Sequence, residues 1–166
     1  MIKIKIKKME KDAKLPQRQK EGDVGFDAYI HRFKGINEKE RKLYNTVDNK
    51  GIKLNRVCLH KLFKVVCCLG FATEIPEGYY AQLVPRSGLA LWDSTTIVNT
   101  PATIDSGYRG EWIVIVISLF DGEVNLEVGD RICQIIFRKV INCKFDVVSK
   151  LNNSDRGVGG FGSTGK

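Results

Sequence analysis

The segment 156–165 combines glycines with a guanidinium group and two hydroxyls. Glycines let backbone N–H groups converge on phosphate oxygens, so such a run can form an anion-binding nest. Arg156 would add a bidentate clamp, and Ser163 and Thr164 would add hydroxyl donors. The run has no G-K-[ST] signature and is not a P-loop. Phosphate binding is the chemistry that these residue types predict, although the segment alone would also fit a flexible glycine-rich tail.

Two further segments place polar groups at turns of the chain. Residues 85–90 follow an expected strand and enter a short helix, which brings Arg86, a hydroxyl and helix N-terminal amides to one point. Residues 99–110 have the pattern of a hairpin that carries one carboxylate, Asp105, and one tyrosine, Tyr108. Taken singly, the first segment is also explained as a helix cap and the second as a β-turn with an Asx cap.

A fourth segment, residues 129–137, is a turn that feeds an apolar strand. Gln134 interrupts its hydrophobic run, and a polar amide there needs a partner in the core or in a ligand. Glycine, hydroxyl, arginine and carboxylate groups therefore recur in four separate segments. Such an inventory favours binding of a phosphorylated ligand.

Short strands must position these segments, because period-two and short apolar runs dominate the sequence and the helical period is nearly absent. Ile2, Ile4 and Ile6 alternate with lysines, as in a strand with one buried face. Further strands are expected at 24–30, 65–71, 79–84, 96–98, 111–119 and 131–140. One short helix is expected at 87–92, with Ser87 as its cap. This pattern predicts an all-β barrel or sandwich.

Composition places the chain among ordinary soluble globular proteins. It has 166 residues, 43% of them hydrophobic and 28% charged, which suits one domain. We expect this domain over 1–152, with a charged insertion at about 33–56 and a glycine-rich arm at 153–166. No apolar run is long enough to cross a membrane, and the first residues lack a signal-peptide pattern, so we expect a cytoplasmic protein.

The net charge of +8 lies in residues 1–20 and 32–64. These blocks lack interleaved aromatic side chains and any known reader motif, which disfavours a nucleic-acid partner and favours a solvated basic face.

The five cysteines form no C-x-x-C pair, and neither histidine has a zinc-type spacing to them. The sequence therefore predicts reduced cysteines that are buried as small core residues.

Together with residues 23–27, the four segments resemble the five motifs of the trimeric dUTP pyrophosphatase (dUTPase) family, in the family's order. The resemblance covers about residues 21–31 and 65–166, and the segments 85–90 and 156–165 match most closely. It implies a jelly-roll-like β-barrel that forms a homotrimer with shared active sites, each closed by the C-terminal arm of a neighbouring subunit. It also implies hydrolysis of dUTP to dUMP and pyrophosphate, which keeps uracil out of DNA and supplies dUMP for thymidylate synthesis.

The resemblance assigns roles to individual residues. Asp105 would activate the water that attacks the α-phosphorus. The phosphates would be bound by Arg86, Ser87, Gly88, Gln134, Arg156, Gly162, Ser163 and Thr164. Mg²⁺ would be held mainly by the triphosphate, with Asp27 in contact at most through water.

The same resemblance places base selectivity in residues 99–110. Tyr108 would pack against the deoxyribose and exclude a 2′-hydroxyl. The uracil edge would be read by Asn99, Ala102, Thr103 and Ile104, and Phe161 would stack over the ring. Ala102 stands where the family usually has glycine, so its methyl group would either tighten rejection of thymine or displace the uracil.

Two alternatives remain open from the sequence. A dCTP deaminase shares this fold, but residues 99–110 and 156–165 follow the dUTPase pattern. The second alternative is a nucleotide-gated regulatory protein, for which the basic insertion at about 33–56 would be the candidate surface for a protein partner.

Overall fold

Short antiparallel strands make up nearly all regular structure in the computed structural model of the chain, which describes residues 2–34, 55–160 and 163. The strands are β1 (Lys5–Lys8), β2 (Phe26–Tyr29), β3 (Arg32–Lys34), β4 (Arg56–Leu59), β5 (Lys64–Cys68), β6 (Phe71–Glu74), β7 (Tyr79–Pro85), β8 (Thr95–Ile97), β9 (Ala102–Ile104), β10 (Ile113–Ser118), β11 (Val124–Glu127) and β12 (Arg131–Lys139). Among the described residues the helix is α2 (Ser87–Trp92). The predicted all-β chain with one short helix is confirmed.

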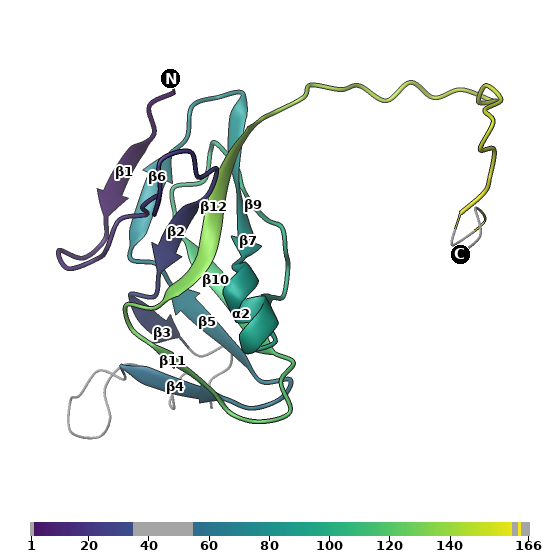
Figure 1. Cartoon of the computed structure of the whole chain (residues 1–166). Coiled ribbons are helices and arrows are strands. Elements are labelled where there is room, and N and C mark those ends of the chain that lie inside the picture. The colour runs from purple at the N-terminus through teal and green to yellow at the C-terminus, as the bar shows by residue number, and fades with distance from the viewer. Residues whose placement is uncertain (1, 35–54, 161–162, 164–166) are drawn as a thin grey trace.

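Two four-stranded sheets form the body of the protein (Figure 1). Their strand orders are β3-β5-β10-β8 and β2-β12-β7-β9, and two-stranded sheets β1-β6 and β11-β4 lie beside them. The pairing of the described strands does not close into a barrel, which corrects the expected β-barrel. Closure needs hydrogen bonds between edge strands, and β2, β9, β3 and β8 remain the edges of two separate sheets.

One hydrophobic cluster fills the space between these sheets. Leu83 and Ile135 come from one four-stranded sheet, and Val65 and Val114 come from the other. Trp112 is fully buried and directly precedes β10. Its backbone N–H donates to the carbonyl oxygen of Phe71 on β6 at 2.9 Å, which links these two strands. Burial of alternate side chains along each strand thus fixes which residues face outward.

Six of the predicted strands were found with small shifts, and one of these is divided. The N-terminal strand differs more: β1 spans Lys5–Lys8, all four of its residues are exposed, and Ile2 is exposed as well, which corrects the expected strand with one buried face. Gly70 separates β5 from β6 with a φ of 75°, a left-handed conformation that glycine adopts without strain. A Cβ at this position would also lie 2.7 Å from Ala13 Cβ and from His31 Cγ. The chain therefore turns at Gly70, where the sequence pattern predicted one continuous strand. β3, β4, β9 and β11, which span three or four residues each, were not among the predicted strands.

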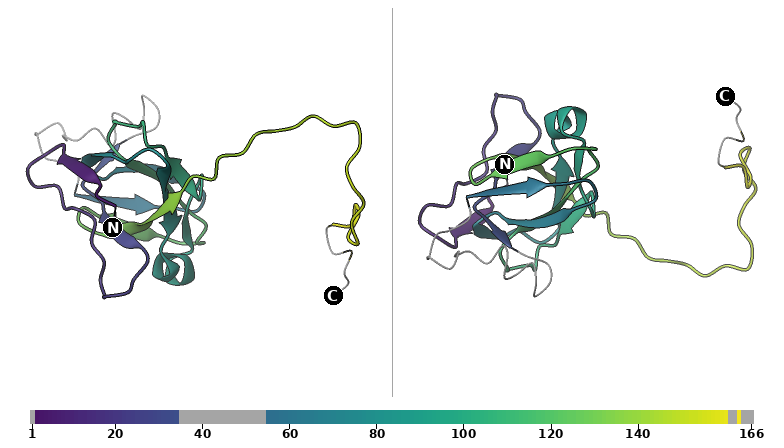
Figure 2. Two further views of the ribbon diagram at one scale, coloured as in Figure 1. Left: turned by 90° about the horizontal axis from the view of Figure 1, so that it is seen from above. Right: turned by 90° about the horizontal axis from the view of Figure 1, so that it is seen from below.

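One described segment of the chain lies outside the sheets. After β12 the chain extends away from the sheets, as all views show (Figure 2). The predicted insertion at about 33–56 lies largely outside the described residues, which resume at residue 55 just before β4. Within the described ranges, no helix has the length and apolar character to span a bilayer.

Candidate active site

The sheet β2-β12-β7-β9 brings four of the predicted segments side by side. Asp27 lies on β2 directly opposite Gln134 on β12, and Gln134 lies opposite Val84 on β7. Arg86 directly follows β7, and β9 carries the residues Ala102–Ile104 on the other side of β7. Segments that are far apart in the sequence are thus joined by strand pairing.

A buried carboxylate, Asp27, lies at the centre of this arrangement and is 2% exposed. Its Oδ1 accepts hydrogen bonds from Arg86 Nε at 3.2 Å and from Gln134 Nε2 at 3.3 Å. Its Oδ2 accepts from an Arg131 guanidinium nitrogen at 3.1 Å. A second Arg86 nitrogen donates to the Arg131 carbonyl oxygen at 3.2 Å. The carboxylate thereby fixes two guanidinium groups and one amide at one end of the sheet.

The polar partner that Gln134 requires is therefore Asp27. Gly25 allows this side chain to lie against the backbone, since a Cβ at Gly25 would come within 3.2 Å of Gln134 Cβ. Sequence reasoning missed Arg131 as a member of the cluster. The position of Arg131 in the sequence could have indicated this role. Arg131 follows the turn at Gly129 and is the first residue of the strand that carries Gln134.

The thiol of Cys133 is buried beside this cluster. Burial and the negative charge of Asp27 together raise the pKa of Cys133 to about 12, although the positive charge of Arg86 opposes this rise. The thiol therefore stays neutral at physiological pH and is not a nucleophile. Cys67 and Cys68 are also buried, as predicted, whereas Cys58 is half-buried and Cys143 is exposed, which corrects the prediction for those two.

The helix α2 begins at Ser87, and the residue at its N-cap position is Arg86, without a side-chain capping bond. This corrects the prediction that Ser87 caps the helix. Ser87 and Gly88 are exposed in the first helical turn, next to the guanidinium of Arg86. No side-chain capping bond therefore occupies the N–H groups of the first helical turn.

The segment after β9 presents its polar groups to solvent. Asp105 and Thr103 are exposed, and the Tyr108 hydroxyl donates to the Glu111 carbonyl oxygen at 3.1 Å. Gly110 permits this position of the tyrosine, because a Cβ there would lie 2.6 Å from Tyr108 Cζ. The exposed carboxylate and the exposed tyrosine thus share one loop.

Ala102 points into the protein and belongs to the hydrophobic cluster, with 7% of its surface exposed. Its methyl group packs in the core, on the face of β9 opposite to Thr103. Asn99 is exposed, and Ile104 is partly buried against the core.

Within one chain, Asp105 lies away from the cluster around Asp27. Ile104 lies opposite Ala81, whereas Arg86 follows the far end of β7. At about 3.3 Å of rise per residue, the distance along the strand from Ala81 to Arg86 is roughly 16 Å. The backbone positions of Asp105 and Arg86 therefore lie towards opposite ends of β7 in one chain.

The glycine-rich segment lies beyond β12 and away from the sheets (Figure 1). Within it, Arg156 Nε donates to the Gly159 carbonyl oxygen at 3.0 Å, and Ser163 N donates to the Gly160 carbonyl oxygen at 3.1 Å. The predicted ligand residues Phe161, Gly162 and Thr164 lie outside the described residues. The structure therefore does not bring Arg156 or Ser163 to the cluster around Asp27 within one chain.

A magnesium ion would not be held directly by Asp27 in this arrangement. Both carboxylate oxygens already accept hydrogen bonds, and the side chain is 3% exposed. Direct coordination would break the pairs with Arg86 and Arg131. The cluster fits an ion that is carried by a ligand's phosphates and hydrated on its protein side.

A family model and a sequence relative both match this chain and indicate the same family. The family model described as dUTPase matches residues 54–165. Deoxyuridine 5'-triphosphate nucleotidohydrolase of Clostridium tetani is 37% identical over 163 residues, which cover 98% of this chain and 97% of that protein.

Solved structures show the same fold. A dUTPase of Staphylococcus bacteriophage 80alpha with dUpNHpp superposes with a TM-score of 0.76 at 23% identity, over 100% of both chains. A dUTPase mutant from phage phi11 of S. aureus, for which coordination of a structural Mg(II) ion is described, has a TM-score of 0.70 at 17% identity. It matches 92% of this chain and 100% of its own.

Proposed function

This chain belongs to the dUTPase family, and from that premise we propose that it hydrolyses dUTP to dUMP and pyrophosphate by attack of water on the α-phosphorus. The observation that carries the proposal is the convergence of Arg86, Gln134 and Arg131 on the buried carboxylate of Asp27. It joins three of the segments that resemble the family's motifs. A fixed, donor-rich cluster of this kind suits phosphoryl chemistry, which depends on positioning and charge neutralisation.

The phosphates bind in this proposal at the end of β7, where Asp27 orients the donors. Arg86, Ser87, Gly88 and Gln134 contact the phosphates from the β-sheet body, and Arg156, Gly162, Ser163 and Thr164 complete the site from the arm. The substrate's phosphates would hold Mg²⁺, with Asp27 in contact at most through water, and the ion would neutralise part of the phosphate charge. Because its Nε is tied to Asp27, Arg86 binds phosphate with little further loss of side-chain freedom.

Asp105 is the general base in this mechanism. It accepts the proton of the attacking water, whose oxygen forms a bond to the α-phosphorus while the bond to the bridging oxygen of pyrophosphate breaks. A positioned base contributes about 10²–10⁴-fold to a rate. The exposure of Asp105 is consistent with this role, since a carboxylate that must meet substrate cannot be enclosed in the core of its own chain.

Each active site is shared in a homotrimer, according to this proposal. The separation of Asp105 from Arg86 supports it, because Asp105 of one subunit would need to meet Arg86 of another. The segment after β12 supports it independently. Ile141, Phe145, Val147 and Leu151 are at least 80% exposed, and such apolar side chains need a surface to cover them. We assign that surface to neighbouring subunits of the same chain.

Base and sugar selection belong to the exposed loop around β9. Asn99 and the backbone from Ala102 through Thr103 to Ile104 read the uracil edge, Tyr108 packs on the deoxyribose, and Phe161 stacks on the ring. Since the methyl group of Ala102 lies in the core, it does not reach the base. A missing hydrogen-bond partner in such a site strongly penalises the wrong base.

The direct test is Mg²⁺-dependent release of pyrophosphate, measured in parallel with dUTP, dCTP, dTTP and UTP. Release from dUTP alone is the expected result. No release from any nucleotide by the folded protein would contradict the proposal. Release of ammonia from dCTP would assign the chain to the deaminases of this fold instead.

A further inference from the structure

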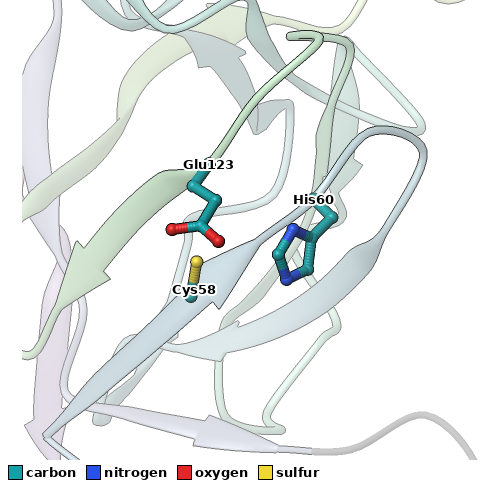
Figure 3. Close-up of side chains that lie close together, drawn as sticks. All are labelled: Cys58, His60 and Glu123. Atoms are coloured by element: carbon teal, nitrogen blue, oxygen red, sulfur yellow. The ribbon is translucent and has the colours of Figure 1, made fainter.

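A cluster of three different ligand types lies on the small sheet β11-β4, which is separate from the sheet that carries the candidate active site. Val57 and Leu59 of β4 are buried, so Cys58 and His60 lie on the outward side of the strand. Val124 at the start of β11 pairs with Leu59 at the end of β4, so Glu123, which directly precedes β11, lies beside His60, which directly follows β4. Figure 3 shows the thiol, the imidazole and the carboxylate close together.

The three ligand atoms lie within 4.8 Å of one another. In a tetrahedral zinc site with bonds of about 2.0–2.3 Å, ligand atoms are roughly 3–4 Å apart. Because His60 and Glu123 are exposed, rotation about their side-chain bonds is enough to close that difference. Cys58 lies on β4 and His60 directly follows the strand, so their side chains are two residues apart along the chain.

The donor set selects the kind of metal. Thiolate, imidazole and carboxylate are the three groups that bind Zn²⁺ in proteins, whereas Mg²⁺ and Ca²⁺ require oxygen ligands throughout. The neighbouring cations are engaged elsewhere, because Arg56 pairs with Glu127 at 3.1 Å and Lys61 pairs with Asp121 at 3.5 Å. The carboxylate of Glu123 therefore faces the thiol and the imidazole.

We propose that Cys58, His60 and Glu123 form a zinc-binding site, with water in the fourth position. The ion connects β4 to the start of β11 and stabilises the folded chain, because it binds the assembled ligands and not the unfolded protein. This site is independent of the proposed hydrolysis of dUTP, since its ligands belong to a different sheet from Asp27 and Arg86.

Cobalt substitution tests the site on the reduced, full-length protein without nucleotide. Binding of one Co²⁺ per chain should produce a thiolate-to-cobalt charge-transfer band, which only a complex with a cysteine ligand can show. Cys58→Ser should abolish this band, and the matched control Cys143→Ser should retain it, because Cys143 is exposed outside the cluster. Titration with Zn²⁺ against a chromophoric chelator should show affinity that falls at least about 10-fold in Glu123→Gln and His60→Gln.

Circular dichroism of each variant shows whether it is folded, which distinguishes loss of metal binding from loss of fold. Glu123→Gln tests the site without altering the half-buried cysteine. A band that persists in Cys58→Ser would overturn the proposal, as would absence of Co²⁺ and Zn²⁺ binding by the unsubstituted protein. The described cluster of Glu10, Asp12 and His31 contains no sulfur and cannot produce the band. Hydrolysis of dUTP by Cys58→Ser should match that of the unsubstituted protein, so failure of either proposal is recognised separately.

Discussion

The Nε atom of Arg86 lies 3.2 Å from Oδ1 of Asp27, although the two residues are 59 positions apart. The same carboxylate accepts from Arg131 and Gln134 on β12. A single buried charge thus holds donors from two segments that the sequence presents separately. Asp27 acts as a positioning residue in the proposed site, and Arg86 and Gln134 act on the substrate.

Replacement of Asp27 tests this arrangement. Asp27→Asn keeps the side-chain volume but removes the charge that pairs with Arg86 and Arg131. We expect a loss of roughly 1–3 kcal/mol in the free energy of unfolding. We also expect a fall of about 10²-fold in kcat/KM for dUTP, because displaced donors bind the transition state less well. Urea unfolding and steady-state kinetics measure the two effects.

Asp121→Asn is the matched control, since the side chain of Asp121 is 88% exposed in a turn. It should change neither quantity appreciably. Unaltered kinetics in Asp27→Asn would show that the donors do not depend on the carboxylate.

The shared site predicts complementation between two inactive variants. Arg86→Ala and Asp105→Ala should each be nearly inactive alone. If a site takes Arg86 from one subunit and Asp105 from another, random mixed trimers from equal amounts should regain about a quarter of the intact sites. Pyrophosphate release from the co-refolded mixture measures the recovery.

A second mixture serves as the control for complementation. Arg86 and Gln134 lie in one cluster within one chain, so a mixture of Arg86→Ala with Gln134→Ala forms no intact site. Recovery in this control mixture, or none in the first mixture, would contradict a site divided between Arg86 and Asp105 of different subunits.

Substitution of Phe145 tests the role of the segment after β12. Phe145 is 92% exposed in one chain, so Phe145→Ser would have little effect on a monomer. If a neighbouring subunit covers the ring, the change should cost about 3 kcal/mol or more of assembly free energy. Sedimentation at decreasing protein concentration should then show earlier dissociation.

Lys144→Ser is the control, because its side chain is also exposed and lies next to Phe145. It should dissociate as the unsubstituted protein does. Equal assembly of all three proteins would exclude Phe145 from a subunit interface.

The buried thiol of Cys133 predicts a dependence of stability on alkaline pH. Its pKa is raised from 9.0 to about 12, so the folded state keeps the proton where the unfolded state loses it. This contribution to stability is fully present below the unfolded pKa and declines as the pH rises towards the folded pKa. Between pH of about 8 and about 10, the free energy of unfolding of Cys133→Ala should decline less than that of the unsubstituted protein. Denaturant unfolding at both pH values measures the difference, and equal declines would contradict the burial of this thiol.

Local patterns in the sequence were sufficient for part of the fold. Alternating and short apolar runs predicted β7, β10 and β12 nearly to their ends, because burial of one strand face imposes that period. The helix α2 was predicted at its observed bounds. The divided strand at Gly70 was missed, since its cause is the close approach of Ala13 and His31 from elsewhere in the chain.

The sequence by itself determined the inventory of functional groups and their order, because glycine-rich turns, arginines and carboxylates are visible as local patterns. Only the tertiary structure decided which of them meet. Strand pairing brought Asp27, Arg86, Arg131 and Gln134 together, placed the methyl group of Ala102 in the core, and assembled Cys58, His60 and Glu123 from two strands. The physical reason is that contacts across a sheet depend on register, which follows from burial over the whole chain and not from the spacing of nearby residues.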